Sequence, residues 1–320
     1  MYISEQHVRS VLTYEALIPA IRQALIDYTA GRVTQPPRMI LRAGNADDHR
    51  NGWFGIMPAI SGDVMGVKIV TFYPGNDVLG IHTHMANIEL LRRETGEPLA
   101  VMDGRLITEM RTAAVSAVAF AVLVPLHFAE APASFGIIGS GVQARAHIQA
   151  LKHVWPGLRE IRIASRNPEN AARLAAEVDA RAVPAEEAAA SDVVLTATTS
   201  PVPVLLGRWL KPNALVLAVG ASTATLREID DEAMLSSYVV AEARANVERE
   251  SGDVILSGAK VQAEIGGILM NPSSASIPRD RRVIFKTVGM AVEDITAARL
   301  VWNALQADSS LTSASVEPGY

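Results

Sequence analysis

The order of apolar and polar positions divides the chain into stretches of different character. From Met1 to about Val124 the pattern is mixed, with a helical period over residues 14–30 and a strand-like run, "VMGVKIVTFYP". A turn-rich segment, "RAGNADDHRNG", lies between them, and a further helix is expected to open near Thr108. This mixture predicts an α+β unit.

Short β-branched runs follow between about Ala133 and Val240, and helical segments separate them. The runs are "SFGIIG", "EIRIAS", "DVVLTAT", "ALVLAVG" and "SYVVAE". Alternation of strands and helices is typical of a doubly wound parallel sheet, the Rossmann type of α/β fold. Because the runs are continuously apolar, we expect the strands to be buried on both faces.

A last strand, "VIFKTVG", begins at Val283, and an amphipathic helix is expected from Met290 to about Leu305. This helix could return to the first domain. We therefore expect one domain of residues 1–125 and 290–307, a Rossmann domain of residues 126–289, and a small, polar, disordered tail over residues 308–320.

Composition narrows the function classes. The 320 residues are 49% apolar with a formal net charge of −5, and no basic run or interleaving of basic and aromatic residues occurs. Nucleic acid and anionic membrane are therefore disfavoured as partners, and small-molecule chemistry is favoured. No uncharged apolar run reaches the length of a membrane span and the N-terminus does not read as a signal peptide, so we expect the cytoplasm. The absence of cysteine excludes disulfides and thiolate chemistry.

A glycine-rich turn stands between the first predicted strand of the parallel sheet and the next helix. Gly139 permits a tight turn, Gly141 lets the backbone approach a pyrophosphate, and Ala144 allows close helix packing. Ser140 lies between the glycines, and the helix N-terminal amides would face the anion. The context favours a dinucleotide site over an ordinary glycine-rich turn.

The end of the next strand distinguishes the two nicotinamide cofactors. An NAD-specific site usually carries Asp or Glu there, whereas this chain has Ser165 and Arg166. A hydroxyl followed by a guanidinium suits a 2′-phosphate, so we expect NADP(H) in preference to NAD(H). A solvent-facing arginine is the alternative interpretation.

Three cations of the first domain form a second group of candidates: Arg38, Lys68 and Arg111. The neighbours of Lys68 are apolar, although strand alternation also allows an exposed lysine there. Arg111 is expected to start an alanine-rich helix, where a cation opposes the helix dipole unless an anion compensates it. Taken singly, each fits a surface charge; beside a nicotinamide site, together they indicate a substrate carboxylate.

Other polar residues are weaker candidates. His82 and His84 are spaced to share one strand face, but no third ligand suggests itself, so we expect no metal site and interpret the histidines as site-lining or packed residues. Lys286 lies beside the last strand. Glu293 and Asp294 open the last helix, where acidic side chains favour the dipole and are expected to be structural caps.

Seven phrases of the sequence resemble the ornithine cyclodeaminase/mu-crystallin family. The matching phrases run in order over almost the whole chain: "QPPR", "MPAISGDVMGVKIV", "TGEPLAVMDG", "LITEMRTAAVSA", "IIGSGVQARAH", "PVLLGRWLKPNALVLAVGAS" and "VIFKTVGMAVEDITAA". The resemblance implies a homodimer built from a substrate-binding and dimerisation domain plus a Rossmann domain. It also implies chemistry at the α-carbon of an amino acid, through an imine and a bound nicotinamide.

The resemblance also assigns roles by position. It implies that the three cations clamp the α-carboxylate and that Met57 and Val288 lie beside the substrate. The cofactor contacts that it implies are Thr83, Val142, Gln143, Thr198, the 216–220 stretch with Val219 and Gly220, and Thr287.

The sequence departs from cyclodeaminases at two carboxylates. Ser222 occupies the position of the catalytic aspartate, and Gly55 that of a glutamate before the "MP". An ammonium in a desolvated pocket needs a carboxylate partner, and so does acid–base work on it. We therefore expect a ketimine reductase, acting for example on Δ1-pyrroline-2-carboxylate or Δ1-piperideine-2-carboxylate, with Lys68, Arg111 and Ser222 at the catalytic centre. The alternatives are true ornithine cyclodeamination, alanine dehydrogenation, or a crystallin-like protein that binds NADP without turnover.

Overall fold

The computed structural model describes residues 1–43 and 52–307, and internal contacts divide the chain into two compact units. Unit 1 comprises Met1–Arg111 and Met290–Tyr320, and unit 2 comprises Thr112–Gly289. The first division thus falls at residues 111/112, within helix α3 (Arg105–His127), and not at 125/126 as expected. The helix itself begins at Arg105, earlier than the predicted Thr108. The predicted tail and most of the turn-rich segment lie outside the described residues.

Unit 1 contains a six-stranded sheet in the order β1-β6-β5-β4-β3-β2. Its strands are β1 (Tyr2–Ile3), β2 (Met39–Ala43), β3 (Gly52–Ser61), β4 (Val64–Phe72), β5 (His84–Arg92) and β6 (Pro98–Asp103). Strand β1 pairs parallel with β6, and the remaining pairs are antiparallel. Its helices are α1 (Glu5–Val11), α2 (Tyr14–Thr29), η1 (Pro74–Leu79) and α11 (Ala291–Ala307).

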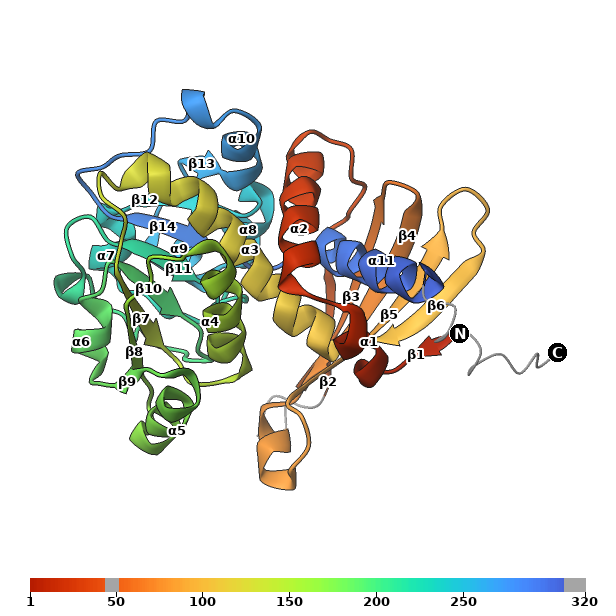
Figure 1. The fold of residues 1–320 in the computed structure, drawn as a ribbon, viewed down its shortest axis with the longest axis horizontal. Helices are drawn as coiled ribbons and strands as arrows, with labels where there is room; N and C mark the ends of the chain where they lie inside the picture. Colours follow the sequence, from red (N-terminus) through yellow and green to blue (C-terminus); the bar gives the residue numbers. More distant parts are fainter. Residues whose placement is uncertain (44–51, 308–320) are drawn as a thin grey trace. The chain divides into compact units, whose positions relative to one another are not determined.

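One face of this sheet is covered by helix α11, which contacts strands β3 to β6 and packs against α2 (Figure 1). Strand β4 shows why, because every second residue from Val64 to Val70 is buried while the alternate ones are more exposed. Gly66 permits close packing, since a Cβ there would lie 2.8 Å from the Ile295 Cδ1 atom. The predicted α+β character of this part of the chain is confirmed.

Unit 2 is built on an eight-stranded, fully parallel sheet in the order β13-β12-β14-β11-β10-β7-β8-β9. Its strands are β7 (Ser134–Ile138), β8 (Glu160–Ala164), β9 (Arg181–Ala182), β10 (Val193–Thr196), β11 (Leu215–Ala218), β12 (Tyr238–Ala241), β13 (Ala263–Glu264) and β14 (Val283–Lys286). Its helices after α3 are α4 (Val142–Val154), α5 (Pro168–Val178), α6 (Ala185–Ala189), η2 (Gly207–Trp209), α7 (Asp231–Ser236), α8 (Arg244–Glu250), α9 (Gly252–Ser257), α10 (Ile265–Met270) and η3 (Pro272–Ser274).

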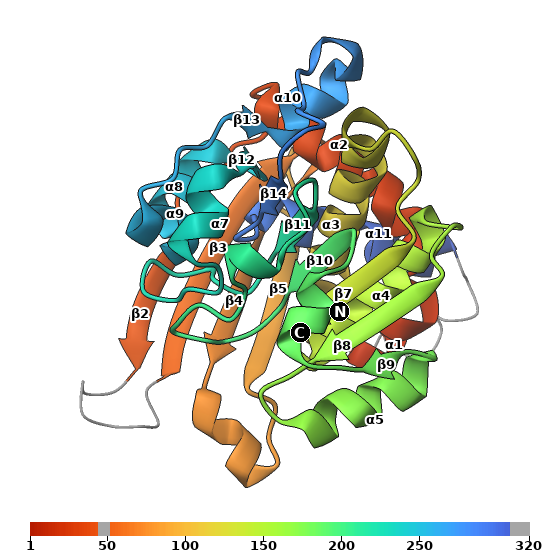
Figure 2. The ribbon, with the colours of Figure 1, turned by 90° about the vertical axis from the view of Figure 1, so that its left-hand side faces the viewer.

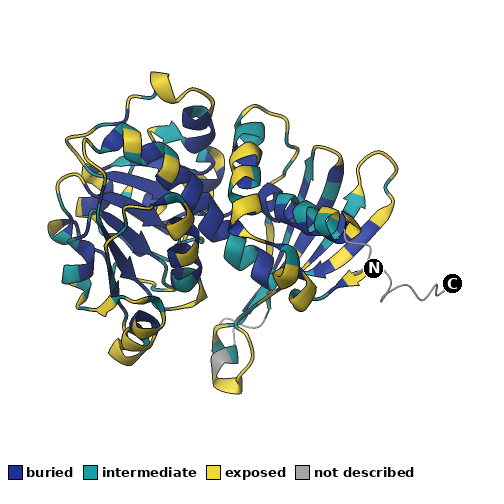
Figure 3. Ribbon diagram, in the orientation of Figure 1, coloured by how far each residue is buried: buried dark blue, intermediate teal, exposed yellow. Residues whose placement is uncertain are grey.

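Burial on both faces, predicted for the apolar strands of unit 2, is confirmed for the central ones, whereas β8 alternates because Glu160 and Arg162 are partly exposed. Every residue of β7, β10, β11 and β14 is buried (Figure 3). Figure 2 shows α3 and α4 on one side of the sheet and α7, α8 and α9 on the other. The chain winds outward in both directions from the neighbouring strands β7 and β10, so a ligand crevice is expected at their carboxyl ends. The Rossmann prediction is confirmed.

Helix α3 is long and apolar enough to cross a bilayer by length and composition. However, 67% of its most apolar window is buried inside the protein, and a core helix passes the same test. The cytoplasmic location expected from the sequence stays a prediction.

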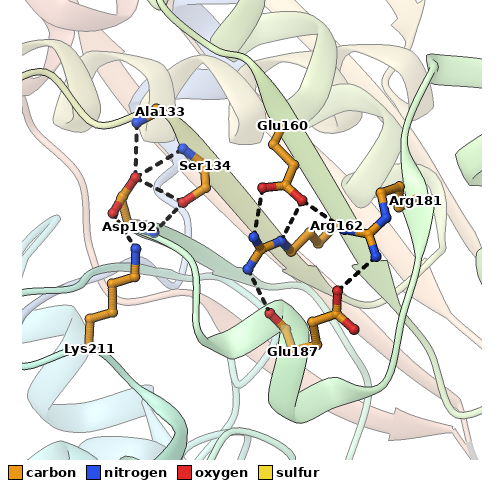
Figure 4. A network of polar contacts seen from close by, with 8 residues as sticks. All are labelled: Ala133, Ser134, Glu160, Arg162, Arg181, Glu187, Asp192 and Lys211. Carbon is orange, nitrogen blue, oxygen red and sulfur yellow. Dashed lines mark hydrogen bonds and ion pairs between the residues drawn. The ribbon is translucent and has the colours of Figure 1, made fainter.

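Asp192 ties the amino ends of β7 and β10 together (Figure 4). Its Oδ2 atom accepts hydrogen bonds from the amides of Ala133 and Ser134 and from the Ser134 hydroxyl at 2.8–3.0 Å. Its Oδ1 atom lies 2.6 Å from the Lys211 Nζ atom. Partial burial opposes ionisation, but Lys211 and these donors outweigh it and lower the pKa of Asp192 to about 2.

We expect Asp192→Asn to lower the free energy of unfolding by about 1–3 kcal/mol at neutral pH, because amide donors lose a charged acceptor. The contribution of Asp192 is complete above its unfolded pKa and is lost as pH falls through the folded value of about 2. The stability difference between variant and parent should therefore shrink in acid. Urea denaturation followed by circular dichroism measures both effects, with the exposed Asp280→Asn as control; equal losses in the two variants would contradict the assignment.

Candidate active site

Lys68 is the central buried cation of unit 1. It lies on β4 in the alternation that faces α11, and only 1% of its surface is exposed. Its Nζ atom lies 2.6 Å from the Asp294 Oδ2 atom. Strand alternation left an exposed lysine possible, and the structure excludes it.

Arg111 reaches the same carboxylate from helix α3. Its Nε atom donates to Asp294 Oδ1 at 2.9 Å and its Nη1 atom to Glu293 Oε2 at 2.8 Å. Because α3 begins at Arg105, Arg111 lies in the second turn and not at the helix start. The expected position at the helix start was wrong, whereas the compensating anions that the sequence analysis allowed for are present as two carboxylates.

The carboxylates come from the first turn of α11. Glu293 also accepts a hydrogen bond from the Met290 amide at 3.1 Å, so it caps the helix as predicted. The purely structural interpretation was nevertheless incomplete, because both side chains are fully buried against the cations. Lys68, Arg111, Glu293 and Asp294 are called the ion cluster below.

Ionisation in the ion cluster follows from burial and neighbouring charge. Burial is the main cause that lowers the pKa of Lys68, to about 8; Asp294 opposes the change, whereas Arg111 and Arg38 reinforce it. Burial raises the pKa of Asp294, but Arg111 and Lys68 outweigh it, so the pKa of this carboxyl lies below its ordinary value. At neutral pH the ion cluster therefore holds charged groups on both sides.

The other candidates of unit 1 surround Lys68. Met57 on β3 is buried and pairs directly with Lys68 across the antiparallel ladder. Arg38 is half-buried just before β2, close enough for its charge to act on Lys68. His84 faces the same side of the sheet, and burial together with Lys68 and Arg111 lowers its pKa to about 4.

Gly55 lies on the same face of β3, paired with Val70. A Cβ atom at Gly55 would lie 3.0–3.1 Å from side-chain carbons of Val70, Ile40 and Trp53. Apolar groups therefore crowd the position to which the family resemblance assigns a glutamate in cyclodeaminases.

The two histidines do not share a strand. Strand β5 begins at His84, so His82 precedes it and is exposed; its carbonyl accepts a bond from the Asn76 side chain at 3.0 Å. Thr83, between them, accepts a bond from the Tyr73 amide at 2.8 Å through its own carbonyl. Among the described residues, no group of three potential metal ligands occurs.

In unit 2 the glycine turn joins β7 to α4. Gly139 has φ of 129°, and a Cβ atom there would lie 2.4 Å from the Ala197 carbonyl oxygen, so glycine is required. Gly141 is the N-cap of α4, and no side chain caps this helix end in the described structure. Ala144 is fully buried, as close helix packing requires. The first-turn amides are thus placed to receive an anion, with Val142 exposed and Gln143 half-buried beside them.

Ser140 is linked to the next strand by a hydrogen bond of 2.8 Å from its hydroxyl to that of Ser165. Arg166 follows Ser165 and is exposed just before Asn167, the N-cap of α5. The structure therefore joins Ser165 to the turn, and Arg166 is the next residue in the chain, with an exposed side chain.

A buried carboxylate that sequence reasoning missed joins the next two strand ends. Glu228 accepts from the Thr196 hydroxyl at 2.9 Å, from the Thr198 amide at 2.6 Å and from the Gly220 amide at 2.7 Å. Ser222 follows, with its amide donating to the Gly220 carbonyl at 2.9 Å, and Val219 donates to the Thr196 carbonyl at 3.0 Å. Glu228 thus fixes two segments that carry predicted cofactor contacts.

Two further carboxylates complete this edge of unit 2. Asp253 accepts from the Glu228 and Ile229 amides at 2.8 and 3.0 Å and lies 3.1 Å from the buried Lys286 ammonium. Glu242 accepts from the Thr287 hydroxyl and from the amides of Val288 and Gly289. Lys286, noted in the sequence without a role, is therefore a structural counter-ion.

One sequence signal could have found Asp294. In α11 it shares the buried stripe of Ala298, Val301 and Leu305, at helical spacings of four, seven and eleven residues. An acid on an apolar stripe must meet a cation. Glu228, Glu242 and Asp253 carry no comparable signal, because most of their hydrogen bonds come from backbone amides of other segments.

The architecture defines an α/β protein that combines a Rossmann unit with a unit whose mostly antiparallel sheet carries buried cations. The sequence matches the ornithine cyclodeaminase/mu-crystallin family over residues 1–309, and the chain belongs to that family. It is 38% identical to the ketimine reductase mu-crystallin of Mus musculus over 311 residues, 94% of each chain.

Solved structures agree with this assignment. The Δ1-pyrroline-2-carboxylate reductase of Thermococcus litoralis, in complex with NADH and L-proline, superimposes with a TM-score of 0.88 at 30% identity, covering 96% of this chain and 98% of that one. An archaeal alanine dehydrogenase, a dimer with bound NAD, gives a TM-score of 0.87 at 26% identity and covers 96% of both chains.

Proposed function

We propose that the protein is an NAD(P)H-dependent reductase of ketimines that carry a carboxylate next to the imine carbon, such as Δ1-pyrroline-2-carboxylate and Δ1-piperideine-2-carboxylate. Reductases of this kind are among its relatives at 38% and 30% identity. The observation that carries the proposal is the charge of the groups around Lys68.

The charged side chains around Lys68 are three cations and two carboxylates. The cations are Arg38, Lys68 and Arg111, and the carboxylates are Glu293 and Asp294. The formal charges of these five side chains sum to +1, which one substrate carboxylate would neutralise. A guanidinium presents planar paired donors to a carboxylate, so Arg111 and Arg38 are assigned to bind it. Retention of this clamp favours an enzyme over a protein that binds only the cofactor.

Unit 2 fits a dinucleotide. The uncapped amides of α4 suit a pyrophosphate, and Glu228 and Glu242 hold the segments of Thr198, Gly220 and Thr287 in place. When bound, the reduced nicotinamide supplies a hydride to the imine carbon. Lys68 supplies the proton to the imine nitrogen, since it is a buried ammonium whose pKa of about 8 lies near neutral pH.

Cyclodeamination of L-ornithine is the second candidate, through family membership. It needs a group that handles the substrate amine, and neither Ser222 nor Gly55 provides a carboxylate. The apolar atoms around Gly55 favour the reductase further, because an ammonium placed there would be desolvated without a partner.

The protein should oxidise NAD(P)H in the presence of a cyclic ketimine carboxylate and release negligible ammonia from L-ornithine. Lys68→Ala should lower kcat/KM by at least about 100-fold, through loss of a positioned proton donor. Steady-state absorbance assays measure both, with the exposed Lys260→Ala as control. Rapid ornithine turnover by the parent protein would refute the assignment.

We also propose NADP(H) as the preferred cofactor. The similar structures hold NADH and NAD, so the preference rests on Ser165 and Arg166 alone. An exposed guanidinium after the second strand suits a 2′-phosphate.

NADPH should bind more tightly than NADH, and Arg166→Ala should narrow the difference by about 1–3 kcal/mol, the range for a charge-assisted contact. Fluorescence titration of both cofactors measures it. Arg173→Ala, an exposed arginine on α5, is the matched control. Equal affinities of the parent for both cofactors would remove the argument.

A homodimer through unit 1 is the third proposal. The sheet face opposite α11 exposes large apolar side chains on five strands: Tyr2, Met39, Leu41, Ile69, Met85 and Val101, each 39–59% exposed. A patch of this kind marks an interaction surface, and the similar alanine dehydrogenase is a dimer.

Light scattering should show a dimer at micromolar concentration, and Ile69→Asp should shift it to the monomer because the charge would be buried in the interface. Ile255→Asp, at a similarly exposed isoleucine of unit 2, should leave the dimer intact. A monomeric parent protein would contradict the proposal.

A further inference from the structure

Asp294 divides its two oxygens between two cations. Oδ2 lies 2.6 Å from the Lys68 ammonium and Oδ1 accepts from the Arg111 guanidinium at 2.9 Å. The side chain is fully buried, so water does not screen these contacts. The carboxylate therefore couples the group assigned to the proton to a group assigned to the substrate carboxylate.

The start of α11 holds Asp294 rigidly. Glu293 binds both the Met290 amide and Arg111, and the Val292 amide donates to the Gln35 side chain at 2.8 Å. The ion pair of 2.6 Å with this fixed carboxylate therefore restricts where the Lys68 Nζ atom can lie.

Resting on the reductase function proposed above, we propose that Asp294 is a positioning residue that keeps Lys68 protonated and aimed at the imine nitrogen. In the reaction, a proton moves from Lys68 Nζ to the imine nitrogen while the hydride of the reduced cofactor adds to the imine carbon. The C=N double bond becomes a single bond, the cofactor is oxidised, and Lys68 regains a proton from water.

The charged and titratable groups that face Lys68 come from four segments. Asp294 of α11 favours the protonated ammonium, whereas Arg111 of α3 and Arg38 before β2 disfavour it. His84 of β5 is neutral at neutral pH, since its pKa is lowered to about 4. Asp294 is thus the anion in direct contact with Lys68, and its removal should lower the pKa of Lys68.

The test measures Lys68 directly. The chain contains five lysines, Lys68, Lys152, Lys211, Lys260 and Lys286, so ¹³C labelling of lysine leaves few ε-methylene signals, and Lys68→Met assigns the relevant one. In the parent protein the Lys68 signal should titrate with a midpoint near pH 8. In Asp294→Asn it should fall by about 1–3 pH units, the usual effect of losing an adjacent opposite charge.

The second readout is the pH profile of kcat/KM for ketimine reduction. The alkaline limb should coincide with the Lys68 midpoint and move down with it in Asp294→Asn. Asp294→Glu retains the charge and should keep the midpoint within about half a unit while lowering kcat, because the longer side chain displaces the ammonium. The matched control Glu293→Gln, which contacts Arg111 rather than Lys68, should move the limb less.

An unchanged Lys68 midpoint in Asp294→Asn would overturn the inference whatever the activity. If Asp294→Asn does not fold, the parent protein still provides a test. An alkaline limb of its kcat/KM profile at a different pH from its Lys68 titration midpoint would overturn the inference equally. The two proposals can fail separately. If the parent protein does not turn over ketimines but the Lys68 midpoint falls as expected in Asp294→Asn, the proposed function is refuted and the coupling of Asp294 to Lys68 is supported.

Discussion

The contact between Asp294 and the two cations is the constraint on which unit 1 depends. Burying an ammonium and a guanidinium beneath a helix is costly unless carboxylates face them at hydrogen-bond distance. The ion cluster satisfies this condition with two acids on adjacent positions of α11, one of which also caps the helix. Residues about 180 positions away from Arg111 in sequence are thereby required at the same site.

Unit 2 uses carboxylates in a different way. Glu228 and Glu242 bind backbone amides and hydroxyls of segments that follow the parallel strands. Asp253 accepts a hydrogen bond from the Glu228 amide and pairs with Lys286. Each carboxylate accepts hydrogen bonds from several donors that water would otherwise bind. These bonds fix loops that have little regular secondary structure of their own. The predicted cofactor residues Thr198, Gly220 and Thr287 owe their positions to these acids.

The positions that differ from cyclodeaminases follow the same physical logic. Gly55 is surrounded by carbon atoms of Val70, Ile40 and Trp53, so the strand is packed for an apolar neighbour there. Ser222 supplies a hydroxyl in a loop tied to Gly220. With no acid at either position, the function proposed above relies on the buried cations to bind a carboxylate and needs no partner for a second amine.

The sequence by itself determined the fold class, the strands of the parallel sheet and the glycine turn, because these depend on apolar periodicity and local backbone conformation. It also selected Arg38, Lys68 and Arg111, and through the family resemblance Met57 beside them. It could not pair Lys68 and Arg111 with Asp294, nor place Glu228 against Thr198 and Gly220, because those contacts join segments far apart in the chain. Only the tertiary structure decided them: desolvation inside a packed unit makes a buried charge seek its partner in space, whatever the distance along the sequence.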